Sequence, residues 1–482
     1  MSRPPLEVAD LIRAAGTTFY ERSRKWFSWL HLKILTAIVC CRTSALGGHI
    51  DKCSRCGYRA ISFNSCRNRH CPKCQARARD RWLEARSREL LPTRYVHVVF
   101  TLPRQLAPIA LQNKSEVYGL LFRSSAETLL AVARDPRHLG AEIGFFSVLH
   151  TWNQKLLHHP HVHCIVPAGG LSPDHTRWMA TPHGFFLPVR VLSRVFRGKF
   201  VAGLRALHAA GKLGFHGSLG GFAAPAAFAA MLRTLFRDDW VVYAKRPFGG
   251  AEHALRYLGC YTHRVAISNH RLVALEGGEV VFRWRDSAHN NKKRLMRLGL
   301  DEFLRRFFLH VLPTGFVRIR HFGYLAHRRR AALLPLAFSL LASHTAAQPV
   351  TALPAAAIPR PLWVCPQCGG PMAIAERFTA SEARMRAPPP PRQPLWPALC
   401  HLELHYRRGA SPRPARIFTE VGGRRLTGDS NADPERPQLL CSSHLHTSTQ
   451  PFKAHNVGSP NGSLQVALSK TLRPGALAHA RR

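Results

Sequence analysis

The sequence predicts an α+β protein with a central antiparallel sheet, a zinc-binding segment before the sheet and a disordered tail after it. Short β-branched runs alternate with amphipathic helical segments in the middle of the chain. Two Cys-x-x-Cys pairs precede this region, and prolines and polar residues dominate after it. We therefore divide the chain into a helical N-terminal segment (1–45), a zinc-binding domain (46–92), a main α+β domain (93–335), a linker with a CPQCGG element (336–375) and a disordered tail (376–482).

The main domain has recognisable strands and helices. Runs of β-branched and aromatic residues predict strands over 95–103, 161–171, 238–248 and 263–275. Apolar residues at helical spacing predict helices over 77–91, 105–134, 251–263 and 301–313. Residues 185–235 are rich in Ala and Gly and are expected to form a helical insertion outside the sheet.

The charge indicates a polyanionic partner. Lys and Arg number 69 against 27 acidic residues, which gives a formal net charge of +42. The positive charges of a protein this basic repel one another unless a polyanion neutralises them. Nucleic-acid phosphates can do so, and DNA is therefore the expected partner. The first residues lack the apolar run of a signal peptide, and no stretch is long and apolar enough to span a membrane. We expect a cytoplasmic protein. GKLGFHG (211–217) lacks the rest of a Walker loop, so no ATPase motor is indicated.

The cysteines predict a structural zinc site. Cys53-x-x-Cys56 and Cys71-x-x-Cys74 have the spacing of a zinc ribbon. Four thiolates fill the tetrahedral coordination sphere of zinc and leave no position for a substrate, so the site is structural. Thirteen cysteines in a reducing compartment indicate metal binding rather than disulfides. The spare ligands, which could replace one of the four or form a second site, are His49, Cys66 and His70. Cys365 and Cys368 form a third pair, which is half of a zinc site, a remnant, or a pair completed from elsewhere.

A second metal site is predicted in HHPHVHCIV. His161 and His163 are two residues apart on a predicted strand, so both imidazoles point to the same face. Two neutral imidazoles and one oxygen ligand would leave positions on a divalent ion open for a phosphate oxygen. For the third ligand we favour Gln154 over the nearer His158 and His159.

A pair of tyrosines completes this constellation. Tyr257 and Tyr261 are four residues apart in a predicted helix, which places both phenols on one face. A tyrosine oxygen can attack a DNA phosphate, and the 5′-phosphotyrosine linkage that forms conserves the energy of the broken phosphodiester bond. A second tyrosine would accept a second strand before the first is released.

With these residues in place, the chain resembles the two-tyrosine HUH transposases of rolling-circle insertion sequences, which include the related common-region elements. The resemblance spans about residues 25 to 375 and depends on CSRCG with CRNRHCPKCQ, YVHVVFTLP, TWNQKLLHHPHVHCIVPAGGLS, YLGCYTHRVAISNHRL, FLRRFFLHVLPTGFVRIRHFGYLAHR and CPQCGGPM. Because several long strings occur in the right order, the match is specific. Residues 93–335 would then be the HUH catalytic domain, with a ferredoxin-like or RRM-like sheet that has the HUH strand at its centre.

The resemblance also implies roles. His161 and His163 would bind catalytic Mg²⁺ or Mn²⁺, Tyr257 and Tyr261 would be the nucleophiles, and the four cysteines would bind zinc. The enzyme would nick single strands at the ends of an insertion sequence in a bacterial cytoplasm. The candidate phosphate contacts are Arg67, Arg69, Lys73, Lys292, Lys293, Arg294, Arg318 and Arg320.

Two other functions fit part of the sequence. His159, His161 and His163 also match the spaced histidines of histidine-triad nucleotide hydrolases, although Pro160 fits poorly in that strand and a small hydrolase needs no zinc ribbon. A non-catalytic zinc-dependent nucleic-acid-binding protein would account for the charge and the cysteines. The distance between the two tyrosines and the two histidines in space distinguishes the enzyme from this second alternative.

Overall fold

The structure is a computed structural model that describes residues 4–181, 186–244, 266–286, 289–345 and 363–386, together with Gly259 and His263. The predicted nucleophiles Tyr257 and Tyr261 lie outside the described residues. So does most of the expected tail, from residue 387 onwards.

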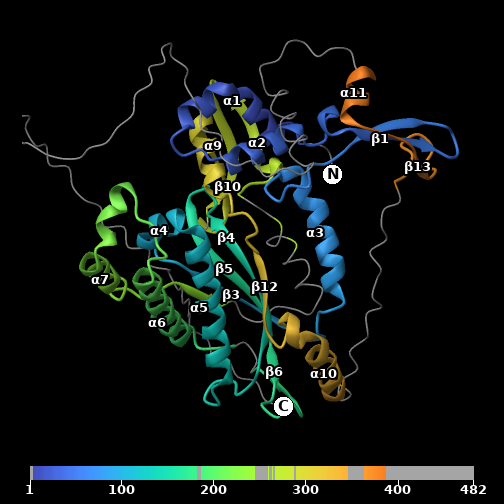
Figure 1. The fold of residues 1–482 in the computed structure, drawn as a ribbon. Coiled ribbons are helices and arrows are strands. Elements are labelled where there is room, and N and C mark those ends of the chain that lie inside the picture. The colour runs from blue at the N-terminus through green and yellow to red at the C-terminus, as the bar shows by residue number, and fades with distance from the viewer. Residues whose placement is uncertain are drawn as a thin grey trace, which may run out of the picture. The chain divides into compact units, whose positions relative to one another are not determined.

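A five-stranded antiparallel sheet forms the centre of the main domain (Figure 1). Its strands, in spatial order, are β12 (Ile319–Gly323), β4 (Gly144–Trp152), β5 (His158–Pro167), β3 (Tyr95–Thr101) and β8 (Val242–Ala244). Strand β5, which carries His161 and His163, is the middle strand of the sheet, and the mixed helix and antiparallel-sheet class predicted from the sequence is confirmed.

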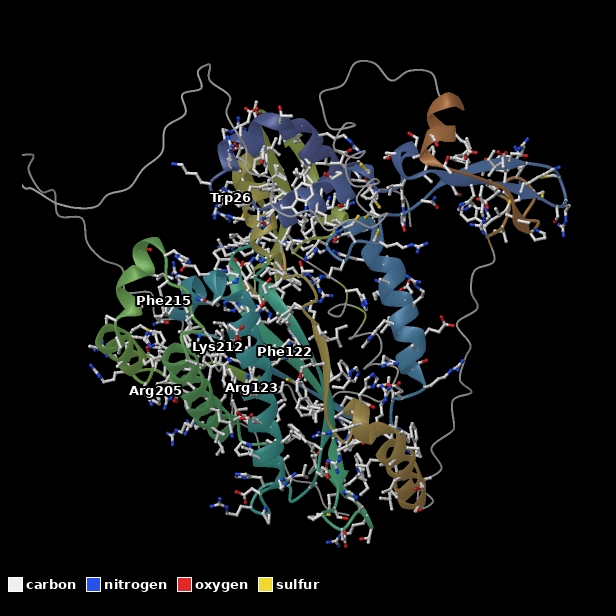
Figure 2. All side chains as sticks on the ribbon, in the orientation of Figure 1. Trp26, Phe122, Arg123, Arg205, Lys212 and Phe215 are labelled. Atoms are coloured by element: carbon white, nitrogen blue, oxygen red, sulfur yellow. The ribbon has the colours of Figure 1, made fainter. Side chains whose placement is uncertain are left out.

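Helices cover one face of this sheet. Val162, Cys164 and Val166 alternate along β5 and belong to the apolar core under α5 (Lys114–Arg134) and α6 (Val189–Ala209). On α5, Phe122 is buried and the adjacent Arg123 is exposed (Figure 2). Helix α6 packs on the sheet through the contact of Phe196 with Phe100, whose ring centroids are 4.9 Å apart. Among its described residues, 185–235 forms helices and turns and contributes no strand to the sheet, and the apolar face of α6 completes the main core.

The opposite face of the sheet is packed partly by α3 (Pro72–Ser87). Trp82 and Leu83 of α3 contact a cluster formed by Tyr95, Phe146 and Ile165. The ring of Trp82 lies 5.8 Å from that of Phe146 in an edge-to-face arrangement. Since Ile165 is two residues beyond His163 on β5, α3 packs on the sheet face that carries His161 and His163.

A second core joins the N-terminal helices to a later part of the chain. The helices α1 (Val8–Ser23) and α2 (Trp29–Cys40) share buried apolar residues with the segment that follows residue 266. That segment contains the antiparallel strands β9 (Leu272–Glu276), β10 (Glu279–Asp286) and β11 (Lys292–Gly299), and then α9 (Leu300–Leu309). Residues 1–45 are thus part of a composite core rather than an independent segment.

The third sheet also combines distant segments. Its spatial order is β13 (Met372–Phe378), β1 (Gly48–Cys53) and β2 (Arg59–Phe63), all antiparallel. Helix α11 (Ala380–Arg386) follows β13. Regular structure therefore continues past residue 375, where the tail was expected to begin, because β13 pairs with β1.

The remaining elements connect these layers. They are α4 (Ala107–Gln112), α7 (Pro225–Thr234), α10 (His327–Thr345), β6 (Gly169–Leu171), β7 (Trp178–Ala180) and 3₁₀ turns over Ser44–Leu46, Arg104–Leu106, Gly217–Ala223 and Asn269–Arg271. The strand predicted over 263–275 is confined to its last residues, since a 3₁₀ turn precedes β9. Within the described ranges, no helix has both the length and the apolar character needed to cross a membrane.

Candidate metal centres and nucleic-acid interface

Three histidines meet on one face of the central sheet. His161 and His163 lie on β5, and His150 lies on β4 directly opposite His161. One ring nitrogen from each lies within 4.8 Å of the others, which is close enough for all three to bind one metal ion. The β4–β5 register creates this group, because directly opposed residues of antiparallel strands point to the same face.

The surroundings favour neutral imidazoles with defined tautomers. The Nδ1 atom of His161 donates to the carbonyl oxygen of His159 at 2.7 Å, so its Nε2 atom keeps a lone pair for a metal ion. His163 Nδ1 is 2.7 Å from His97 Nε2, and both rings are buried. Burial lowers the pKa of His161 to about 4 and that of His163 well below its ordinary value, with repulsion from neighbouring histidines adding to both shifts.

The two residues expected near the histidines as ligands, Gln154 and His158, have other surroundings in the structure. Gln154 is exposed in the turn between β4 and β5, and its carbonyl oxygen accepts a hydrogen bond from Arg271 at 2.6 Å. His158 is hydrogen-bonded to the hydroxyl of Tyr118 at 2.7 Å. Among the described His, Cys, Asp and Glu residues, His150 is the one that joins His161 and His163 within ligand distance.

Two described residues, Gly259 and His263, flank Tyr261 in the sequence. A Cβ atom on Gly259 would lie 3.2 Å from Leu83 of α3. The His263 ring is 5.9 Å from the ring of Trp82, also on α3. Both contacts are thus with the helix that packs on the histidine-bearing face of the sheet.

The cysteines form two clusters, and neither is the predicted set. Cys53 and Cys56 do not meet Cys71 and Cys74. The first cluster is buried at the start of α3 and consists of Cys41, Cys66, Cys71 and Cys74, with Cys74 Sγ 3.5 Å from Cys41 Sγ. Cys41 directly follows α2, and Cys71 and Cys74 lie at the N-terminus of α3. The composite second core brings these segments together.

The second cluster lies at one end of the third sheet and consists of Cys53, Cys56, Cys365 and Cys368. Cys53 Sγ is 3.5 Å from Cys368 Sγ, and Cys56 Sγ is 3.6 Å from Cys365 Sγ. The pair at 365 is therefore completed from elsewhere, which was one of the alternatives that the sequence left open.

The two spare histidines belong to neither cluster. His49 Nε2 lies 3.6 Å from the Asp51 carboxylate, and His70 Nε2 accepts the backbone N–H of Leu312 at 3.2 Å. One further cysteine departs from the sequence expectation, since Cys40 is disulfide-bonded.

A basic cleft of about 1240 Å³ lies between α3, β12 and the third sheet. Five arginines line it, namely Arg42, Arg67, Arg69, Arg81 and Arg318, and four aromatic residues, namely Phe63, Trp82, Phe316 and Trp363. His263 is also part of the wall. Among the described residues that line the cleft, Asp51 is the only acidic one. Arginines and aromatic rings together are the usual components of a surface that binds single-stranded nucleic acid.

The predicted phosphate contacts differ in their availability. Arg67 is exposed at the cleft, and Lys292 and Lys293 are exposed on β11. Arg294 pairs with Asp286 at 3.0 Å. Lys73 is instead buried in an ion pair with Glu7 at 2.6 Å.

The other two arginines with structural contacts lie near Phe316. Arg69 donates to the carbonyl oxygens of Pro313 and Phe316 at 2.7 and 2.5 Å. The Arg320 guanidinium lies 4.4 Å from the ring centroid of Phe122, where it makes a cation–π contact. Arg69, Arg320 and Lys73 therefore have structural contacts within the protein, in addition to any role with DNA.

Comparisons with known proteins define the class of this chain. Residues 144–332 match the family described as "Putative transposase", and residues 11–102 match the family described as "Transposase zinc-binding domain". The first match contains the histidine-bearing strands, and the second contains the whole first cysteine cluster. The chain therefore belongs to the IS91-type rolling-circle transposases with an N-terminal zinc-binding domain, and the resemblance seen in the sequence is confirmed for the family.

Two relatives illustrate this membership. The chain is 54% identical over 354 residues to "Putative transposase y4qJ" of Sinorhizobium fredii (strain NBRC 101917 / NGR234). The aligned residues make up 73% of this chain and 89% of that protein. It is 27% identical over 328 residues to "Transposase for insertion sequence element IS801" of Pseudomonas savastanoi pv. phaseolicola. The aligned residues make up 65% of this chain and 74% of that protein. No solved structure matches the chain. The family implies DNA as partner, and the zinc-binding domain with its cysteine cluster supports a structural zinc ion.

Proposed function

We propose that the chain is an HUH transposase that nicks and transfers single DNA strands through a 5′-phosphotyrosine intermediate. His150, His161 and His163 would hold one divalent ion, and Tyr257 and Tyr261 would be the nucleophiles. The observation that supports this best is the meeting of three buried or half-buried imidazoles on one sheet face in a transposase. Gln154 is no longer part of the proposed ligand set.

The donor set fits a divalent ion and favours one of the two expected. Three neutral imidazole nitrogens suit a transition-metal ion, whereas Mg²⁺ prefers oxygen ligands in a near-octahedral arrangement. Mn²⁺ is therefore the better match. When bound, it would withdraw charge from the non-bridging oxygens of the scissile phosphate.

The tyrosines would perform the covalent step. A phenol oxygen attacks the phosphorus, the phenol proton leaves to solvent, and a Tyr–O–P bond forms. The P–O3′ bond breaks, and the departing 3′-oxygen takes up a proton to become a free 3′-OH. The positions of Gly259 and His263 against α3 support this assignment, because α3 packs on the sheet face that carries the histidines.

The basic cleft is the proposed path for a single strand. Its arginines would neutralise phosphates, and Trp82 and Trp363 offer ring faces for unpaired bases. His263, which follows Tyr261 by two residues in the sequence, lines the same cleft.

Family membership favours this function over the two alternatives. A non-catalytic zinc protein would have no use for three converging imidazoles in a chain that also contains a paired-tyrosine motif. A histidine-triad hydrolase would use His161 as the nucleophile, whereas its Nδ1 atom is held by the carbonyl of His159 and its Nε2 atom points to the ligand group.

The test is formation of a covalent protein–DNA adduct. The full chain is incubated with Mn²⁺ and single-stranded oligonucleotides that cover both ends of its insertion sequence, and adducts are resolved under denaturing conditions. We expect an adduct with the wild type, a reduced yield with Tyr257→Phe or Tyr261→Phe, and none with the double variant.

The matched control is Tyr243→Phe. Tyr243 is 53% exposed on the edge strand β8 and lies outside the paired-tyrosine motif, so its adduct yield should equal that of the wild type. An adduct of undiminished yield in the double variant would refute the tyrosine assignment. Absence of any wild-type adduct with every strand from both ends would refute the proposed activity.

A further inference from the structure

The two cysteine loops of the second cluster have the same local structure. Both have the sequence Cys-x-x-Cys-Gly, and each glycine adopts a positive φ, 73° for Gly57 and 67° for Gly369. Such a φ strains other residues, so glycine follows from the shape of the loop. Two independent segments of the chain thus form the same tight turn around their cysteines.

Backbone hydrogen bonds repeat between the loops as well. The N–H of Gly57 donates to the carbonyl oxygen of Cys53 at 3.1 Å, and the N–H of Gly369 donates to the carbonyl oxygen of Cys365 at 2.9 Å. The N–H of Cys53 donates to the carbonyl oxygen of Tyr58, five residues later, at 2.8 Å. The N–H of Cys365 likewise donates to the carbonyl oxygen of Gly370, five residues later, at 2.8 Å. In addition, the N–H of Arg55 points to Cys53 Sγ at 3.4 Å. Such turns present both sulfurs of a pair to one point, as zinc knuckles do.

The third sheet holds the loops face to face. Cys53 is paired with Met372 across β1 and β13, and the N–H of Ser54 donates to the carbonyl of Pro371 at 3.1 Å. Space at the contact is tight, since a Cβ atom on Gly370 would lie 3.2 Å from Cys53 Sγ and 3.3 Å from Cys368 Sγ. The four sulfurs lie within 4.8 Å of one another.

We propose that Cys53, Cys56, Cys365 and Cys368 bind a second structural zinc ion, separate from the ion of the first cluster. Four thiolates fill a tetrahedral coordination sphere and leave no position for substrate. Each thiol releases one proton when it binds the ion. The ion joins residues 309 positions apart in the sequence, beyond the limit of the matched zinc-binding domain at residue 102.

The second zinc ion would also shape the basic cleft. Trp363, Met372 and Ile374 line the cleft, and all three lie in the segment that the ion would fasten to β1. Bringing together two segments so far apart in the sequence costs conformational entropy. A metal cross-link offsets this cost and so stabilises this wall of the cleft. Zinc removal would therefore release one side of the proposed DNA path.

Zinc content tests the proposal directly and does not depend on the proposed DNA chemistry. The full chain, purified without chelators, should contain two zinc ions per molecule by elemental mass spectrometry, one for each cysteine cluster. The double variant Cys365→Ser/Cys368→Ser should contain one, and Cys53→Ser/Cys56→Ser should give the same value. Cys400→Ser, which alters a cysteine of neither cluster, should retain both ions.

Cobalt substitution separates ligand loss from misfolding. The sulfur-to-Co²⁺ charge-transfer absorption scales with the number of bound thiolates, and it should fall by half in Cys365→Ser/Cys368→Ser while the remaining tetrahedral cobalt bands persist. A misfolded chain would lose both sets of bands. One zinc ion in the wild type, or two in either double variant, would overturn the proposal.

Discussion

His97 Nε2 lies 2.7 Å from His163 Nδ1, so a buried histidine of β3 holds the ring of a candidate metal ligand on β5. The two rings lie in nearly parallel planes, with an interplanar angle of 3°. This bond occupies Nδ1 of His163 and directs its other nitrogen to the group formed with His150 and His161. His97 therefore acts as a positioning residue that fixes a ligand without touching the ion.

We expect His97→Ala to weaken Mn²⁺ binding by roughly 10- to 100-fold, because loss of an outer-shell partner lets the ligand ring rotate. Titration calorimetry with Mn²⁺ on the full chain measures the effect. His97→Gln, which can still hydrogen-bond to His163, should recover part of the affinity, which a purely structural role would not predict. Equal Kd values for the wild type and His97→Ala would remove His97 from the site.

The third ligand can be decided by a pair of neighbouring substitutions. We expect His150→Ala to reduce Mn²⁺ affinity at least as strongly as His161→Ala does, because it removes one of three nitrogens from the group. Gln154→Ala should bind Mn²⁺ like the wild type, because that side chain is exposed in the β4–β5 turn. The same calorimetric titration applies to both. The reverse ranking would restore the ligand set expected from the sequence.

The sequence could predict the local part of the histidine site but not its completion. Alternation along a strand places His161 and His163 on one face, and β5 keeps that arrangement. His150 lies on β4, a fully buried strand with no alternation of polar and apolar residues. Its place opposite His161 depends on the β4–β5 register, which a single sequence does not reveal. The sequence offers several histidines near His161, among them His158 and His159, and no local feature distinguishes His150 from them.

The zinc ligands show the same limit at longer range. Each Cys-x-x-Cys turn is visible in the sequence because the spacing and the following glycine are local features. Which pair meets which depends on the pairing of β1 with β13, which brings Cys53 of β1 to Cys368, in the loop before β13 and 315 residues away in the sequence. Cys41 directly follows a helix and has no paired cysteine near it in the sequence, and only the composite second core brings it to Cys74. Proximity in sequence therefore favoured the wrong partner for Cys53.

Acid should destabilise the protein through its buried histidines. His310 donates Nε2–H to the Leu156 carbonyl at 3.0 Å and accepts the Thr151 hydroxyl at Nδ1, 3.2 Å away. Burial lowers its pKa to about 3, with repulsion from His158 adding to the shift. Between the unfolded pKa of about 6.5 and the folded pKa, only the unfolded state binds this proton, so stability is lost as the pH falls through that window.

From about pH 7 to about pH 5, His310 should account for about 2 kcal/mol of the loss in unfolding free energy. Urea unfolding at both pH values, followed by circular dichroism, measures it. In His310→Gln the difference between the two pH values should shrink by that amount, although the variant is less stable at both. His216→Gln, at an exposed position after α6, should leave the difference unchanged. Zinc release in acid affects all three proteins equally, so an identical pH difference in His310→Gln and the wild type would exclude the histidine as its cause.

Lys73 and Arg67, both predicted phosphate contacts, should separate into a stability residue and a DNA residue. The side chains of Lys73 and Glu7 are 9% and 7% exposed, and the Lys73 ammonium also donates to the Cys41 carbonyl at 3.2 Å. Lys73→Met leaves the buried Glu7 carboxylate without this ammonium and should lower the unfolding free energy by roughly 3 kcal/mol. Arg67→Gln removes an exposed cation at the basic cleft and should leave that free energy unchanged within about 0.5 kcal/mol.

Binding to a fluorescent single strand across a salt series should show the opposite ranking. Arg67→Gln should weaken binding several-fold and reduce the slope of log Kd against log salt by about one phosphate contact. Lys73→Met, assayed at a temperature where it is fully folded, should keep the wild-type slope, because its ammonium faces the protein interior rather than the cleft. A reduced slope in folded Lys73→Met, with Arg67→Gln unaffected, would place the DNA path on a different surface from the cleft lined by Arg67 and Trp82.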